Sequence, residues 1–525
     1  MDFGTILFWS ICLSCLPALF RGMIRPGSIG RGWIVVYLVV LTITATGAWQ
    51  QSDLSVYAGG ALWTSLVLVP AILSHVYVRS VLQQRFGLAQ RVAQVMRALH
   101  PADGWREQPQ IARALKLAHQ DKLAAAIELL QHHRNANGQA ALTAVANLHR
   151  LTNQWEEFLA WRQAHIPDLR ADLSFLSMTL RALGETGDLT GLIQTYERHK
   201  TAIARLEPAV QRNFCRLMLF AFWGERAPVE RLFRGSLLIL PVSVQRFWLA
   251  TADRAAGRHE DAQRELHRLA QDTDPTMRRA AEFRLARRPA RPEEHATAHA
   301  RQLIASAREE LDQEERFGAH PRLFSRRARA TQILLALNLV VFLREIQKGG
   351  STDAAVLYQL GGLVPQAVRE GEWWRPATAI FLHYGFLHLL MNMLALWALG
   401  PLVEFALGFR RFGALYFLAG IGSMLAVVGL ATGSAQQTLT VGASGCVMGV
   451  VGATGAIMLK GWRREKARVA WRRFVAVLMI LILQTAFDWV VPEVSMTAHL
   501  SGALIGFASA LFFKNRLSGI ESSAG

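Results

Sequence analysis

The chain has 525 residues, of which 52% are hydrophobic, and it carries a formal net charge of +18 at pH 7. This length exceeds one ordinary domain, and so apolar a composition argues against a wholly soluble protein. The basic residues lie mostly in short runs beside apolar segments, where they set orientation in a membrane, so the charge does not indicate a nucleic-acid partner. Four scattered cysteines are too few for a disulfide framework.

Three apolar stretches open the chain, each about as long as a bilayer requires: 3–20, 33–49 and 57–77. Only Asp2 precedes the first stretch as a charged residue, and the stretch lacks the basic region and cleavage site of a signal peptide. We therefore expect it to be retained. Residues 1–80 are predicted to form an N-terminal three-span membrane region.

Residues 81–325 are rich in charged residues, Ala and Leu, with no apolar run long enough to span, which predicts a soluble helical domain. Helix, turn, helix units recur in it at intervals of 32, 34, 37 and 33 residues, with turns near Asp121, Asn153, Gly187, Gly224 and Gly257. This period is typical of tetratricopeptide repeats, and the segment from Trp248 to Pro275 is similar to that family. The alternative is a generic helical solenoid. Both have a concave surface suited to a protein or peptide partner.

Six further apolar segments predict a second membrane block over residues 326–516, followed by a tail at 517–525. A charge-rich linker or last repeat helix, 288–329, precedes the block. The expected spans are 331–343, 383–402, 412–431, 442–459, 474–491 and 496–513. The predicted fold class is therefore all-α: a polytopic membrane helix bundle of nine spans with a helical repeat domain.

Basic residues predict the orientation of the bundle. The loop from Lys460 to Arg473 has seven Lys or Arg against the single Glu465, which places it in the cytoplasm. Counting spans from this loop puts the repeat domain and the C-terminus on the same side. We expect a multi-pass protein in the inner membrane of a bacterial cell.

Under this topology three of the C-terminal spans run parallel and carry polar residues near their outer ends. Ser444 lies two residues into the fourth span, and His499 about three residues into the sixth. The second span carries His388 and Asn392 on one helix face, with His383 at its mouth. Because an ionisable group inside a bilayer is costly, these residues are predicted to form one functional pocket.

The combination of Ser444 and His499 suits nucleophilic catalysis. A serine hydroxyl attacks efficiently only when a nearby base takes its proton, and histidine can accept that proton and return it to the leaving amine. Asn392, His388 and the backbone N–H of Ser444 could stabilise the oxyanion that forms. Packing is the alternative role for each residue, because Ser444 begins a stripe of small residues through which helices approach closely.

No carboxylate is an obvious third member of this group. Asp488 lies at the outer end of the fifth span, and Glu404 at the inner end of the second, where a charge is usually just solvated. The sequence therefore predicts a dyad rather than a triad.

Taken in order over about 190 residues, the motifs of the C-terminal block resemble the signature of the rhomboid family of intramembrane serine proteases. They are Trp374-Arg375, His383 with His388 and Asn392, Gly442-Ala443-Ser444-Gly445, and Ala498-His499 followed by Gly502 and Gly506. The resemblance implies Ser444 as nucleophile, His499 as base, and oxyanion support from His388 and Asn392, with His383 and Gly442 beside them. It also implies a loop ordered by Trp374-Arg375, and glycines that let the fourth and sixth spans pack.

One departure from the family's pattern is Met448, which stands four residues after the serine where many members have an aromatic residue. The thioether can still contact the histidine ring. The resemblance implies an endopeptidase that cleaves in or near transmembrane segments of other proteins, without cofactor or metal. The alternatives are a catalytically inactive membrane adaptor or chaperone, and a transporter that relays protons through its histidines.

Overall fold

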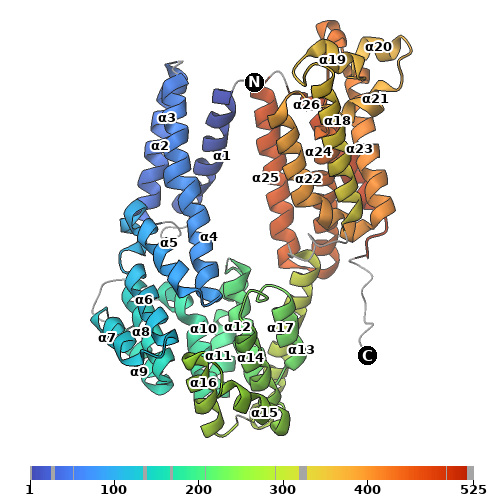
Figure 1. Ribbon diagram of the computed structural model, residues 1–525. Helices are drawn as coiled ribbons and strands as arrows, with labels where there is room; N and C mark the ends of the chain where they lie inside the picture. Colours follow the sequence, from blue (N-terminus) through green and yellow to red (C-terminus); the bar gives the residue numbers. More distant parts are fainter. Residues whose placement is uncertain are drawn as a thin grey trace. The chain divides into compact units, whose positions relative to one another are not determined.

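The computed structural model describes most of the chain (Figure 1). The described residues are 3–24, 30–50, 53–133, 139–165, 169–206, 208–289, 291–318, 328–491 and 494–516. Within them the regular structure is helical, and an isolated β-bridge joins Leu363 and Thr440. The chain divides into two compact units, Met1–Arg308 and Glu309–Gly525. The predicted tail, 517–525, lies outside the described residues.

Apolar helices begin the first unit. They are α1 (Phe3–Ile24), α2 (Arg31–Trp49) and a continuous run of α3 (Asp53–Trp63), η1 (Thr64–Leu68) and α4 (Val69–Leu82). Ile11, Cys15, Val40 and Val67 form their small shared core. Many of their other large apolar side chains are exposed, such as Leu38 and Ile72, as expected for helices that face lipid.

Shorter helices follow, and most have one apolar face; the last of them runs across the boundary between the two units at Arg308. They are α5 (Phe86–Leu99), η2 (Pro101–Trp105), α6 (Gln108–His119), α7 (Leu123–His132), α8 (Gln139–Thr152), α9 (Trp155–His165), α10 (Leu169–Thr186), α11 (Leu189–Ile203), α12 (Ala209–Phe222), α13 (Arg226–Arg234), α14 (Val242–Ala255), α15 (His259–Leu269), α16 (Pro275–Ala286), η3 (Pro292–His295) and α17 (Ala298–Phe317).

Each of the five turns predicted between paired helices contains a residue in the left-handed conformation. The φ angles are 62° at Asp121, 55° at Asn153, 82° at Gly187, 82° at Gly224 and 79° at Gly257. Glycine adopts this conformation without steric cost, and Asn and Asp tolerate it best among the other residues. These residues end one helix and turn the chain into the next, so the predicted positions of the turns are confirmed.

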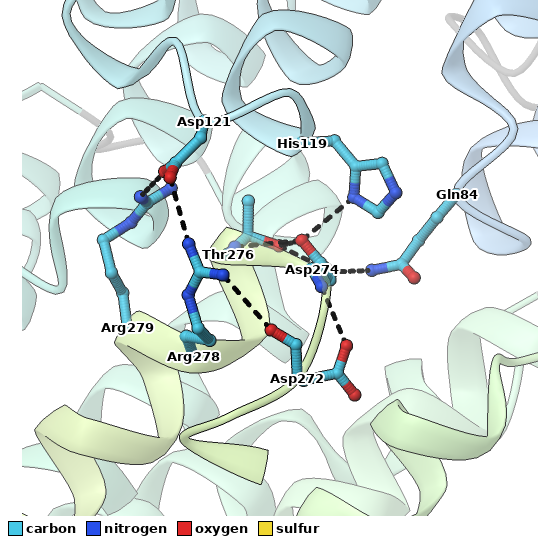
Figure 2. Close-up of polar contacts among 8 residues, drawn as sticks. All are labelled: Gln84, His119, Asp121, Asp272, Asp274, Thr276, Arg278 and Arg279. Atoms are coloured by element: carbon cyan, nitrogen blue, oxygen red, sulfur yellow. Dashed lines mark hydrogen bonds and ion pairs between the residues drawn. The ribbon is translucent and has the colours of Figure 1, made fainter.

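A polar cluster joins α16 to the first helices of this array (Figure 2). Asp274 caps the N-terminus of α16 by accepting a hydrogen bond from the backbone N–H of Thr276 at 2.9 Å. The same carboxylate contacts Nδ1 of His119 at 2.9 Å and accepts a hydrogen bond from Gln84 at 3.0 Å. Asp121, at the tip of the first hairpin, pairs with Arg278 at 3.0 Å and Arg279 at 3.1 Å. These contacts therefore join α16 to the first hairpin of the array.

A buried carboxylate links α10 and α16 inside the array. Glu185 accepts a hydrogen bond from Arg181 Nε at 3.2 Å and another from Arg284 Nε at 3.1 Å. The guanidinium of Arg181 lies 4.7 Å from the ring centre of Trp155, and that of Arg284 lies 4.7 Å from the ring centre of Phe247. Burial lowers the pKa of Arg181, and the neighbouring Glu185 opposes that shift. One carboxylate thus compensates two buried cations.

The second unit contains the helices that hold the candidate site. They are α18 (Arg329–Gln347), α19 (Ala354–Gln359), α20 (Pro365–Arg369), α21 (Arg375–Thr378), η5 (Ala379–Phe381), α22 (Phe386–Leu407), α23 (Phe409–Leu430), η6 (Gly433–Gln437), α24 (Ser444–Glu465), α25 (Arg468–Val490) and α26 (Met496–Phe512). Helix α24 lies at the centre and packs against α22, α23, α25 and α26. Its Val450, Ala453 and Ile457 are fully buried in the core.

Seven helical segments of the described chain are long and apolar enough to cross a membrane. They are Arg31–Trp49, Leu54–Leu82, Arg329–Gln347, Phe386–Leu407, Phe409–Leu430, Ser444–Glu465 and Arg468–Val490. The other two predicted spans correspond to shorter apolar helices, Leu7–Phe20 and Met496–Phe512. The protein is therefore an all-α polytopic membrane helix bundle, as the sequence predicted.

The prediction that Glu404 is simply solvated is wrong. Glu404, near the C-terminus of α22, is 5% exposed. Its carboxylate accepts hydrogen bonds from the backbone N–H groups of Ala330 and Thr331, each at 2.9 Å, and from the Thr331 hydroxyl at 2.8 Å. It thus satisfies backbone donors at the start of α18 that would otherwise lack a partner. Its negative charge is also stabilised by the positive end of that helix dipole.

Candidate active site

Ser444 is the first residue of α24, at the end of an extended segment that follows η6. The segment is held by the bridge between Thr440 and Leu363, whose two hydrogen bonds measure 2.8 Å and 3.0 Å, and by the N–H of Gly442, which donates to the carbonyl of Ala379 at 3.0 Å. The backbone N–H of Ser444 belongs to the first turn of α24, which has no intrahelical acceptor. The candidate nucleophile, Ser444, and the free backbone N–H donors are therefore fixed together at the N-terminus of α24.

Gly442 cannot be replaced by a larger residue without moving the site. Its φ is +133°, in the region that favours glycine. A Cβ at this position would stand 2.7 Å from Cε1 of His388, 2.9 Å from Nε2 of the same ring and 3.6 Å from Oγ of Ser444. Gly442 thus brings the backbone before Ser444 against the His388 ring.

His499 lies in the first turn of α26, whose N-terminus is capped by Ser495 through a hydrogen bond from the N–H of Ala498 at 3.2 Å. Helices α24 and α26 approach closely at glycines. A Cβ on Gly502 would overlap the carbonyl of Gly445, and one on Gly506 would overlap the carbonyl of Gly449. Such close backbone contact requires a residue without a side chain at each point where the helices meet, as glycine provides here.

Ser444 and His499 therefore lie in the first turns of two touching helices. Within the described part of the chain no hydrogen bond joins their side chains. Hydrogen bonds between catalytic groups are often long in free enzymes and shorten when substrate binds. The His388 ring lies against Gly442, two residues before Ser444, so His388 also belongs to this group.

A buried carboxylate accompanies His499, so the prediction that no such third group exists is wrong. Oδ2 of Asp488, near the C-terminus of α25, lies 2.8 Å from Nδ1 of His499. The side chains are 1% and 8% exposed. Oδ1 of Asp488 accepts a hydrogen bond from the amide of Gln484 at 2.8 Å. The one signal in the sequence that could have identified Asp488 was the energetic cost of a carboxylate within an apolar span.

The second span supplies two more polar groups. Asn392 is 6% exposed, and its amide nitrogen has no hydrogen-bond partner among the described residues. His383 is fully buried, its ring lies 5.3 Å from that of His388, and its Nε2 also lacks a partner in the described chain. Buried polar atoms normally have partners, so these two unpaired atoms are candidates for substrate binding.

His383 is held by one contact of its backbone and one contact of its ring. Its backbone N–H donates to Oε1 of Glu345 at 3.0 Å, and its Nδ1 lies 3.1 Å from the carbonyl of Phe381. Glu345, near the end of α18, is fully buried, and the sequence analysis did not single it out. The contact between His383 and Glu345 holds the segment that precedes α22 against α18.

Arg375 orders the loop between α18 and α22. Its guanidinium donates to the carbonyls of Tyr358 at 2.8 Å and Gly362 at 2.7 Å, pairs with Glu372 and lies 3.8 Å from the ring centre of Tyr358. The neighbouring Trp374 is 45% exposed. A buried arginine with this many partners fixes the fold of the loop that precedes His383.

Met448 is buried and packs with Val451, Val477 and Ala503. It therefore fills space between α24, α25 and α26, one turn beyond Ser444. Among the described residues no group of three or more His, Cys, Asp and Glu side chains is arranged to hold a metal ion.

Comparison with known proteins identifies the second unit. Residues 370–516 match the family described as Rhomboid domain. RHOMBOID-like protein 5 of Arabidopsis thaliana is 37% identical over 151 residues, which cover 29% of this chain and 47% of that protein. Rhomboid protease GluP of Bacillus subtilis is 33% identical over 181 residues, 34% of each chain.

The rhomboid-named protein YdcA of Bacillus subtilis is 31% identical over 155 residues, which cover 30% of this chain and 71% of that protein. The first two relatives are matched over less than half of their own length. The family match falls on the part of the second unit that holds Ser444, His388 and His499. By sequence, motif order and helical architecture, the chain belongs to the rhomboid family.

Proposed function

We propose that this protein is an intramembrane serine endopeptidase that hydrolyses peptide bonds in or near transmembrane segments of other membrane proteins. The observation that carries the proposal is the placement of Ser444 and His499 in the first turns of α24 and α26, whose backbones touch at Gly445 and Gly502. A nucleophile and a base need this proximity before substrate arrives. The family's protease members, such as the one named GluP, support the same reaction class.

In the proposed mechanism, Nε2 of His499 takes the proton from Ser444 as Oγ attacks the scissile carbonyl, and later donates it to the leaving amine. The oxyanion of the tetrahedral intermediate accepts hydrogen bonds from the amide of Asn392, the ring of His388 and the backbone N–H of Ser444. Donors already desolvated and lacking partners, such as the Asn392 amide, lose little when the oxyanion forms. Water then hydrolyses the acyl-enzyme by the same proton transfers in reverse.

The substrate must expose its backbone to Ser444. A transmembrane helix keeps its carbonyls in internal hydrogen bonds, so the cleaved segment is expected to contain small or helix-breaking residues that allow local unwinding. Aqueous access at the outer end of α24 would supply the hydrolytic water.

We also propose that the protein lies in the inner membrane of a bacterial cell with its repeat domain, 81–325, and its C-terminus in the cytoplasm. The basic loop between α24 and α25, from Lys460 to Arg473, supports this orientation. Residues 1–80 would then be an N-terminal membrane region, and 326–516 the protease core.

The repeat domain is proposed to bind a cytoplasmic protein or peptide that regulates or delivers substrate. Its paired helices between two membrane blocks motivate this role. Deleting residues 101–289 should change both the proteins that co-purify with the chain and the cleavage of native substrates. If neither changes, the domain has no such role.

Covalent labelling of the purified, detergent-solubilised protein by a fluorophosphonate tests the proposed reaction, alongside cleavage of a generic transmembrane substrate. The natural chain should label and cleave, and Ser444→Ala and His499→Ala should abolish both. Ser80→Ala is the matched control, because Ser80 is a buried serine of α4, outside the second unit, whose hydroxyl donates to the carbonyl of Val76 at 2.7 Å.

Labelling that is lost in both site variants and kept in the control supports an activated serine. A folded natural chain that neither labels nor cleaves would refute the proposal and favour the inactive adaptor or chaperone. Folding is checked independently by the thermal unfolding midpoint of each variant.

A further inference from the structure

We infer that Asp488 is a positioning residue for His499, so that Ser444, His499 and Asp488 act together as a three-residue relay rather than a dyad. Gln484 in turn positions Asp488. The inference rests on the proposed function and deepens it. Asp488 is not one of the reacting groups: it contacts Nδ1 of His499, and the proposed proton acceptor is the other ring nitrogen, Nε2.

The geometry assigns one tautomer to His499. Nδ1 has two neighbours, Oδ2 of Asp488 at 2.8 Å and the amide nitrogen of Gln484 at 3.4 Å. The Gln484 amide already donates to Oδ1 of Asp488 at 2.8 Å. Because a carboxylate can only accept, Nδ1 must carry the proton and donate it to Asp488. Nε2 is then left as the acceptor that general-base catalysis requires.

Charge gives the pair a second role. A carboxylate on a side chain that is 1% exposed in a bilayer-spanning unit is costly unless a partner compensates it. Neutral His499 and Gln484 give it hydrogen bonds but no positive charge. When His499 takes the proton of Ser444, the imidazolium and the Asp488 carboxylate become an ion pair. The interaction is therefore stronger in the transition state than in the ground state, which is the condition for catalysis.

The placement of Asp488 also fits an orienting role. It lies on α25 and His499 lies on α26, and the hydrogen bond between them spans the short connection that follows Val490. Rotation of the His499 ring would break a buried hydrogen bond and leave both partners unsatisfied, so the ring is held in one orientation.

The decisive variant is Asp488→Asn, which keeps the size of the side chain. An asparagine amide would donate to Nδ1 and move the histidine proton to Nε2, the nitrogen that has to accept from Ser444. We expect kcat for a transmembrane substrate to fall by about 10²- to 10⁴-fold with KM within about twofold. Asp488→Glu keeps the carboxylate and should recover at least about tenfold of the lost kcat.

Gln484→Leu is a second variant that keeps Asp488 but removes the amide that fixes it. It should lower kcat by about tenfold, again at nearly constant KM. Glu404→Gln is the matched control, because it removes another buried, hydrogen-bonded carboxylate of the same unit, at the start of α18. Its folded fraction should keep the natural kcat.

The outcomes separate the two proposals. If the natural chain is active and Asp488→Asn keeps its kcat within about threefold, the relay is refuted while the protease function stands. If Asp488→Asn loses its fold, the same decision falls to Gln484→Leu: a natural kcat in that variant refutes the relay. A natural chain without labelling or cleavage refutes the protease function itself.

Discussion

Gly502 of α26 lies directly against the backbone carbonyl of Gly445 in α24, so that a Cβ added at Gly502 would overlap that oxygen. The contact sets the separation of the two helices whose first turns carry Ser444 and His499. The spacing of the candidate nucleophile and base thus depends on a residue that has no chemistry of its own.

Gly502→Ala should therefore both destabilise the second unit and weaken the site. A methyl group forced against a backbone carbonyl requires the helices to separate, and overpacking of this kind costs about 1–3 kcal/mol. Thermal unfolding in detergent should show a lower midpoint, and fluorophosphonate labelling should be slower. The control is Gly413→Ala on α23, where an added Cβ meets nothing within 4 Å. Equal midpoints for the two variants would contradict the prediction.

Glu404→Ala should destabilise the second unit by about 1–3 kcal/mol, because it leaves the backbone donors of Ala330 and Thr331 without an acceptor. Denaturant unfolding of the purified protein measures the change. The exposed Glu370→Ala, which removes only a surface contact with Gln366 at 2.8 Å, is expected to change stability by less than about 0.5 kcal/mol. Comparable losses in the two variants would show that the cap contributes nothing.

Glu185→Gln should destabilise the helical array by about 3–5 kcal/mol, because the guanidiniums of Arg181 and Arg284 would remain buried without their shared counter-charge. Protease resistance of residues 81–308 across a urea series reports this change in the full chain. Glu230→Gln is a suitable control, since Glu230 pairs with the partly exposed Arg226 on one helix. If the Glu185→Gln protein resisted proteolysis as well as the natural chain, Glu185 would not be the counter-charge that stabilises Arg181 and Arg284.

Cys215 should be unreactive in the folded protein. Burial raises the pKa of its thiol from 9.0 to about 12, so at pH 8 almost none of it is the reactive thiolate. In a chain whose other cysteines are replaced, iodoacetamide should modify Cys215 only after denaturation. Modification of the native chain at the rate of a free thiol would contradict the burial.

The raised pKa of Cys215 also predicts a pH dependence of stability. Between pH 9 and 12 the unfolded chain loses this proton while the folded chain keeps it, so the folded state binds more protons and its stability falls as pH rises. The slope from this group is about 1.4 kcal/mol per pH unit. The difference in unfolding free energy between the natural chain and Cys215→Ala, measured at pH 8 and pH 10, isolates it. A pH-independent difference would contradict the shift.

Local patterns in the sequence were sufficient for much of the architecture. Apolar run length located the spans, because a bilayer fixes the length of any helix that crosses it. The turns at Gly187, Gly224 and Gly257 were predictable because a left-handed residue is a local requirement of the chain. The predicted direction of their spans led us to expect Ser444 and His499 to lie close together, and the structure has them in the first turns of two helices that touch at Gly445 and Gly502.

Only the tertiary structure decided which carboxylates find partners far along the chain. Asp488 and His499 are eleven positions apart on different helices, and whether they meet depends on how the chain turns after α25 and on the rotation of each helix. Glu404 lies 74 positions from its partner Ala330, and Asp274 caps α16 while reaching back to His119. Hydrophobic periodicity specifies which face of a helix is buried, but the partner of a buried polar group is specified only by packing, because many arrangements bury the same face.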